Sequence, residues 1–182
     1  MQDRVRQFEA IALPHLDAAY NLARWLLRNE HAADDAVQEA YLRALRYFES
    51  FRGGNAKPWL LGIVRNACFT WLADNRGAMQ PIEFDEDRDT VDPAWPARAE
   101  QDPERLLSIK QDGAALNAAI ERLPVVYREV LILRELEEMT YEEIARVVGI
   151  PSGTVMSRLS RARARLRADL AEPDACQRKE AQ

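Results

Sequence analysis

Apolar residues recur at intervals of three and four through most of the chain, which is the spacing of one face of an α-helix. Three such stripes occupy the first part of the sequence. They consist of Ile11, Leu16, Ala19, Tyr20, Ala23 and Leu27, then Val37, Tyr41, Ala44 and Phe48, then Leu60, Ile63, Val64, Ala67 and Trp71. No alternating apolar and polar pattern of the kind found in strands is evident. The pattern predicts an all-α fold whose first helical domain covers residues 1–76.

The next segment has a different composition. Residues 77–104 carry four prolines and many acidic side chains, with little apolar periodicity. Proline removes a backbone donor and disfavours helix, and a charged segment without apolar periodicity does not build a core. We therefore expect an acidic flexible linker at 77–104, a second helical domain at 105–172 and a disordered tail at 173–182. The predicted architecture is two small helical domains joined by the linker.

Residues 139–168 contain the signals of two helices joined by a tight turn. Thr140 and Glu143 have the spacing of a capping box, in which each side chain bonds the other residue's backbone N–H. Gly149 suits a left-handed helix end and Pro151 prevents the helix from continuing, while Ser152 is a candidate N-cap for the next helix. Two short helices around a glycine-containing turn form a helix-turn-helix, whose second helix enters the DNA major groove.

The second helix of this pair is strongly basic. Residues 152–168 hold five arginines and no acid, although the whole chain has a formal net charge of −5. Arginine bonds guanine edges or phosphates, and small hydroxyl residues permit close approach to DNA. A solvated basic helix is the alternative, but the ordered caps and turn favour DNA binding. The expected outward contact residues are Thr154, Ser157, Arg158, Ser160 and Arg161, with Arg165 placed for phosphates.

Composition narrows the function classes further. No apolar run is long enough for a transmembrane helix and no secretory signal is visible, so we expect a cytoplasmic protein. The two cysteines, Cys68 and Cys176, form neither a disulfide framework nor a metal motif. His31 with Asp34 and Asp35 has a loosely metal-like spacing but lacks a further ligand. We expect no metal, no cofactor and no catalytic residue, and therefore not an enzyme.

Two sets of motifs together resemble one family. The helix-turn-helix and the preceding LPVVYREVLILRELEEMTYEEIA resemble region 4 of bacterial RNA polymerase sigma factors. DDAVQEAYLRAL at 34–45 and PWLLGIVRNACFTWL at 58–72 resemble region 2 of the same sigma-70 family. There is no room between them for the further domains of larger sigma factors. The resemblance is therefore to the extracytoplasmic-function (ECF) group, which directs transcription initiation at particular promoters.

The resemblance implies a polymerase-binding face on the helix predicted at 33–48. Side chains opposite its apolar stripe lie at spacings of three and four, and one of them is a leucine among charges. In the family this face binds the clamp helices of the polymerase β′ subunit. A plain solvated face is the alternative from the residues alone. The residues are Asp35, Gln38, Glu39, Leu42 and Arg46.

The resemblance also implies contacts with the promoter −10 element. Related proteins use the loop after that helix to hold a base flipped out of the DNA, a step whose cost stacking and edge hydrogen bonds can offset. A core aromatic is an equally good explanation of Phe51, Asn66 also suits a cap within the bundle, and Trp59 and Trp71 fit the core better than DNA. The residues assigned to the −10 element are Phe51, Arg52, Asn55, Lys57, Arg65 and Asn66.

The implied partners follow from this assignment. They are core RNA polymerase through its β′ clamp helices and β subunit, promoter DNA, and an anti-sigma factor that is often membrane-bound; the free protein is expected to be a monomer. Met156 and Ser160 stand where some members carry arginine and a large side chain. A response regulator with the same helix-turn-helix, or an adaptor that binds only protein, are the competing hypotheses. The former requires an α/β receiver domain before the DNA-binding domain.

Overall fold

The computed structural model describes residues 2–75 and 113–171. The linker predicted at 77–104 and the tail predicted at 173–182 lie outside the described residues. Within those ranges every regular element is a helix, which confirms the all-α prediction. The elements are α1 (Gln2–Ala12), the 3₁₀ turn η1 (Leu13–His15), α2 (Leu16–Leu27), α3 (Glu30–Arg46), the 3₁₀ turn η2 (Phe48–Ser50), α4 (Ala56–Asp74), α6 (Gly113–Arg122), α7 (Val125–Glu135), α8 (Tyr141–Val148) and α9 (Ser152–Ala171).

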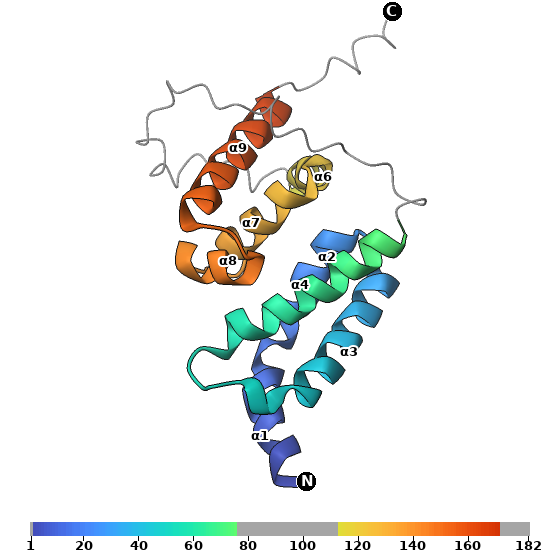
Figure 1. The fold of residues 1–182 in the computed structure, drawn as a ribbon. Coiled ribbons are helices and arrows are strands. Elements are labelled where there is room, and N and C mark those ends of the chain that lie inside the picture. The colour runs from blue at the N-terminus through green and yellow to red at the C-terminus, as the bar shows by residue number, and fades with distance from the viewer. Residues whose placement is uncertain (1, 76–112, 172–182) are drawn as a thin grey trace, which may run out of the picture.

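The N-terminal helices form one bundle, drawn in blue to green in Figure 1. α3 begins three residues earlier than predicted because the Asn29 side chain caps it, accepting a hydrogen bond of 2.9 Å from the Ala32 backbone N–H. The bundle core is rich in alanine, which lets α2, α3 and α4 approach closely. Leu16, predicted in the core stripe, is instead 42% exposed.

The C-terminal helices include the predicted helix-turn-helix, α8 and α9. The capping box between Thr140 and Glu143 is present, and Gly149 ends α8 in the left-handed conformation with φ 77°. Both predictions are confirmed. The N-cap prediction for Ser152 is wrong by one residue, because the carbonyl of Pro151 already accepts the first bonds of α9, from Thr154 and Val155.

The two helical groups pack directly against each other. Figure 1 shows α7 and α8 lying over the side of α2 and α4. Buried residues of both groups belong to one continuous apolar core, which joins Leu26 and Leu61 from the first group to Tyr127 and Ile144 from the second. Apolar burial is the main favourable term in such association. The sequence predicted two domains on a tether and did not predict this closed arrangement.

Candidate functional site

The predicted polymerase-binding side chains lie on one exposed face of α3. Asp35, Gln38, Glu39, Leu42 and Arg46 are all exposed. Leu42 is 60% exposed, so this face presents a large apolar side chain among charged and polar ones. Glu39 accepts a hydrogen bond of 2.6 Å from Arg43 one turn later. This face combines an exposed leucine with charges, as binding surfaces do.

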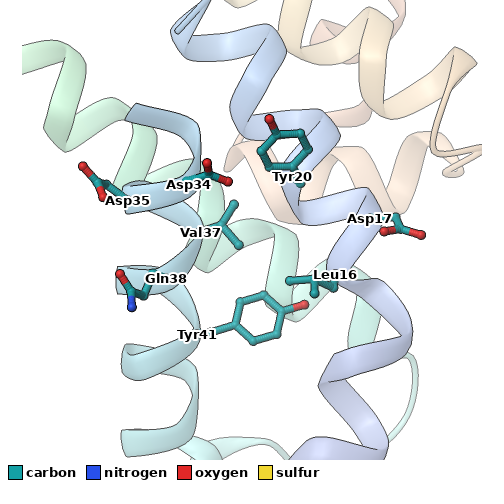
Figure 2. Close-up of a pocket in the computed structure, with 8 residues that line it drawn as sticks. All are labelled: Leu16, Asp17, Tyr20, Asp34, Asp35, Val37, Gln38 and Tyr41. Carbon is teal, nitrogen blue, oxygen red and sulfur yellow. The ribbon is translucent and has the colours of Figure 1, made fainter. Parts of the chain in front are cut away.

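An open groove between α2 and α3 borders this face, as Figure 2 shows. The ring of Tyr41 lies in it and its hydroxyl donates to the Ala12 carbonyl at 3.0 Å. Burial, with a smaller contribution from Asp17, raises the pKa of Tyr41 to about 12, so it stays a neutral donor. The groove is lined by Leu16, Asp17, Tyr20, Asp34, Asp35, Val37, Gln38 and Tyr41. The sequence did not predict the α2 residues here, because Leu16 and Tyr20 fit the core stripe.

Phe51 packs within an aromatic cluster at the start of the loop before α4. Its ring lies 5.0 Å from that of Trp59 and 6.2 Å from that of Phe48, centroid to centroid. The ring is half-buried, so both the core and the base-stacking explanations retain a structural basis. Arg52 and Asn66 are exposed. After the loop, the Asn55 side chain caps α4 by accepting from the Lys57 backbone N–H.

Three of the predicted −10 residues contact the C-terminal helices instead of lying free. The Asn55 amide donates to Glu143 at 2.7 Å. The Lys57 ammonium lies 2.8 Å from a carboxylate oxygen of Glu137. Arg65 binds Glu129 through two nitrogens, at 2.6 and 3.2 Å. In each contact the partner is a glutamate of the second helical group.

The predicted −35 residues on α9 divide into two sets. Thr154, Ser157, Ser160 and Arg161 are partly exposed, and Arg165 is exposed with its guanidinium 5.1 Å from the ring centre of Tyr127. The outward orientation expected for Arg158 is wrong. Its side chain is only 14% exposed, and its guanidinium lies 3.6 Å from Glu129. The apolar stripe prediction for Val155, Leu159 and Ala162 holds, since all three are buried.

Glu129 is the site residue that sequence reasoning missed. Its side chain is fully buried and pairs with both Arg65 and Arg158. Burial raises its pKa, while the hydrogen bonds and positive charge of Arg65 and the charge of Arg158 lower it. A signal existed in the sequence: Glu129 stands beside Val130 and one helical turn from Val126 and Leu133, on an apolar surface of α7.

Residues 2–75 and 113–171 contain no group of three or more His, Cys, Asp or Glu side chains arranged to hold a metal ion. Over the same ranges, no helix combines the length and apolar character that a bilayer crossing requires.

Two family models match the chain, one over the N-terminal helices and one over the C-terminal helices. Sigma-70 region 2 matches residues 11–78 and Sigma-70 region 4 matches residues 113–166. The first match contains α2, α3 and α4, and the second contains the helix-turn-helix. The order of the two matches agrees with the order of the motifs in the sequence.

Relatives cover most of the chain. The ECF RNA polymerase sigma-E factor of Haemophilus influenzae is 34% identical over 88% of each chain. ECF RNA polymerase sigma factor SigE of Mycolicibacterium smegmatis is 33% identical over 94% of this chain, which spans 64% of that relative's length.

Solved structures share the fold. Sigma factor RpoE of Bartonella quintana, solved in complex with the anti-sigma factor NepR, matches with a TM-score of 0.68 and 28% identity, over 93% of this chain and 99% of that one. CnrH, solved in complex with the cytosolic domain of CnrY, matches with a TM-score of 0.62 and 23% identity. This match covers 93% of this chain and 90% of the CnrH chain. The two family matches and these relatives show that the chain belongs to the ECF group of sigma-70 family RNA polymerase sigma factors, which are transcription initiation factors and not enzymes.

Proposed function

We propose that this chain is a promoter-specificity subunit that binds core RNA polymerase through the exposed face of α3. The observation that carries the proposal is Leu42, which is 60% exposed among charged side chains on the helix that matches region 2. An exposed apolar residue at the centre of a polar surface is typical of a protein-binding site. The β′ clamp helices are the partner that family membership implies for this face, and the β subunit is a further one.

The two helical groups would bind separate parts of a promoter. The loop and first turns of α4, with Phe51, Arg52, Asn55, Lys57, Arg65 and Asn66, would hold the −10 element. α9 would lie in the major groove of the −35 element, with Thr154, Ser157, Ser160, Arg161 and Arg165 toward the DNA. Arginines of α9 supply both base and phosphate contacts in this proposal.

The competing hypothesis of a response regulator finds no support in the N-terminal part. Residues 2–75 form helices and contain no strand, whereas an α/β receiver requires a parallel sheet. The basic character of the second helix of the helix-turn-helix argues against an adaptor that binds only protein. The sigma factor proposal accounts for both parts.

An anti-sigma factor is the proposed regulator, acting in the cytoplasm where transcription takes place. Support comes from the structure of sigma factor RpoE of Bartonella quintana, which was solved in complex with the anti-sigma factor NepR. The groove between α2 and α3 offers apolar side chains flanked by Asp17, Asp34 and Asp35, next to the polymerase face. A regulator seated there would compete with polymerase.

The polymerase face is tested by the substitution Leu42→Ala. A buried apolar anchor at an interface contributes about 1–2 kcal/mol, so the affinity for core polymerase should fall about five- to thirtyfold. The measurement is the dissociation constant of the labelled protein for purified core enzyme, obtained by fluorescence anisotropy.

Leu13→Ala is the matched control, because Leu13 is 52% exposed on η1 and lies outside the predicted face. It should bind core polymerase as the unchanged protein does. Equal affinities for both variants would show that α3 is not the binding face. If the unchanged protein has no affinity for core polymerase, the proposed function is wrong.

A further inference from the structure

The N-terminal helix α1 packs against the segment that leads into the −10 loop, residues 51–55, which carries part of the proposed −10 surface. Figure 1 shows α1 beside the end of α3 and the chain that joins α3 to α4. The match to Sigma-70 region 2 begins at residue 11, so residues 2–10 of α1 precede it. The family match therefore assigns no role to most of this helix.

Arg4 connects α1 to the end of α3. One terminal nitrogen of its guanidinium donates to the carbonyls of Leu45 and Arg46, at 2.9 and 3.0 Å. The other terminal nitrogen donates to the Glu49 carboxylate of η2 at 2.9 Å. The last four carbonyls of a helix have no donor within the helix, and the helix dipole favours a cation beside them. One side chain of α1 thus fixes η2 relative to the last turn of α3.

Phe8 makes a second contact between α1 and this segment. Its ring is buried and meets the ring of Phe48 edge to face, with the centroids 5.5 Å apart. The ring of Phe48 is in turn stacked with that of Phe51, 6.2 Å away. The buried apolar cluster around Phe8 is separate from the main core. α1 therefore reaches Phe51, the first residue of the −10 loop, through one intervening ring.

The middle of the −10 loop stands away from the other described residues. Gly53 and Gly54 have φ of 82° and 87°, and a Cβ on either would meet nothing within 4 Å. Glycine loses more conformational freedom than any other residue when it is ordered, so such a loop depends on how its ends are held. The start of the loop is held by η2, where the N–H groups of Ser50 and Phe51 donate to carbonyls three residues earlier. The placement of Phe51 and Arg52 therefore depends on η2.

We propose that Arg4 is a positioning residue for promoter recognition: it fixes η2 against α1 and α3, and so orders the −10 loop before DNA arrives. This inference rests on the proposed function of the −10 surface. Arg4 acts through η2 and not by touching DNA, since its three acceptors all belong to the protein. A loop that is ordered in the free protein spares the DNA complex the entropic cost of ordering it.

The first test is the substitution Arg4→Gln in the full chain. Glutamine keeps a polar side chain but removes the charge and the forked donors that span the three acceptors. Hydrogen–deuterium exchange of the free protein, followed by mass spectrometry, measures the opening of η2. The Ser50 and Phe51 amides should exchange about three- to tenfold faster in the variant, because the charge-assisted bonds that hold η2 are lost.

The same variant should separate polymerase binding from promoter use. Its affinity for core polymerase, measured by fluorescence anisotropy, should not change, because the side chains of the α3 face are intact. Run-off transcription on genomic DNA, with core polymerase saturated by the variant, should fall about three- to tenfold, since only molecules with an ordered loop are competent to bind the −10 element. A residue that merely stabilised the bundle would lower both quantities together.

Arg6→Gln is the matched control, because Arg6 is exposed on the same helix and carries the same charge. It should leave amide exchange and transcription as they are in the unchanged protein. Equal behaviour of the Arg4 and Arg6 variants would overturn the inference, and so would a parallel loss of polymerase affinity and transcription in Arg4→Gln. An unchanged protein that directs no transcription would overturn the proposed function instead, and amide exchange would still decide whether Arg4 orders the loop.

Discussion

At the scale of the residue, Glu129 is a buried carboxylate whose charge is stabilised by two arginine partners. Moving a carboxylate out of water costs several kcal/mol unless opposite charge and hydrogen bonds compensate. Arg65 supplies two hydrogen bonds and Arg158 a second positive charge. The two arginines come from different helical groups, so the buried charge is fully compensated only when the groups are together.

Cys68 permits a test of packing at a single atom. The residue is fully buried, and burial raises the pKa of its thiol to about 12, against small opposing effects of the backbone and of Arg65. Only the thiolate reacts, so Cys68 should resist alkylation at pH 8 and react quickly after denaturation. Iodoacetamide labelling of the Cys176→Ser variant, followed by mass spectrometry, measures this. Rapid labelling of the native variant would contradict the packing of α4.

At the scale of the element, α8 shows how far local signals in a sequence reach. Thr140, Glu143 and Gly149 predicted both ends of the helix, because caps are contacts within a few residues. The α3 face was predictable for the same reason, since helical spacing alone separates Leu42 from the buried alanines. Contacts such as Arg65 with Glu129 join residues 64 positions apart, and no local pattern encodes them.

Thr140→Ala should destabilise the protein by about 1 kcal/mol, because it removes the side-chain oxygen that accepts from the Glu143 backbone N–H. Thr140→Ser keeps that oxygen and should retain most of the stability. Urea denaturation followed by circular dichroism gives the free energies of unfolding. Equal losses for the two substitutions would argue against the capping role.

The capping box formed by Thr140 and Glu143 makes a contribution to stability that depends on pH. The hydrogen bond from the Thr140 backbone N–H lowers the pKa of Glu143 below its ordinary value of 4.5, with smaller lowering effects from Asn55, Thr140 and Arg146 and an opposing effect of burial. A depressed folded-state pKa gives stability above pH 4.5 that is lost as the pH falls through the folded value. The Glu143→Gln variant has no carboxyl group to ionise at this position, so urea denaturation should show it less stable than the unchanged protein at neutral pH and nearly equal to it at acid pH.

At the scale of the whole molecule, the sequence predicted the parts better than their arrangement. The all-α class, the helix-turn-helix and the sigma factor family all followed from spacing, caps and motifs. The closed packing did not, since it depends on the fit of Leu26 and Leu61 against Tyr127 and Ile144. The orientation of Arg158, inward on Glu129 and not outward on α9, likewise depends on a tertiary contact, the packing of α9 against α7.

Transcription by purified core polymerase tests the central claim, that this chain confers promoter specificity. Run-off transcription on genomic DNA of the source bacterium needs no knowledge of the promoter. The reaction with the protein should yield a limited set of transcripts with defined 5′ ends that are absent from core polymerase alone. The same transcripts with and without the protein, or none in either reaction, would contradict the account.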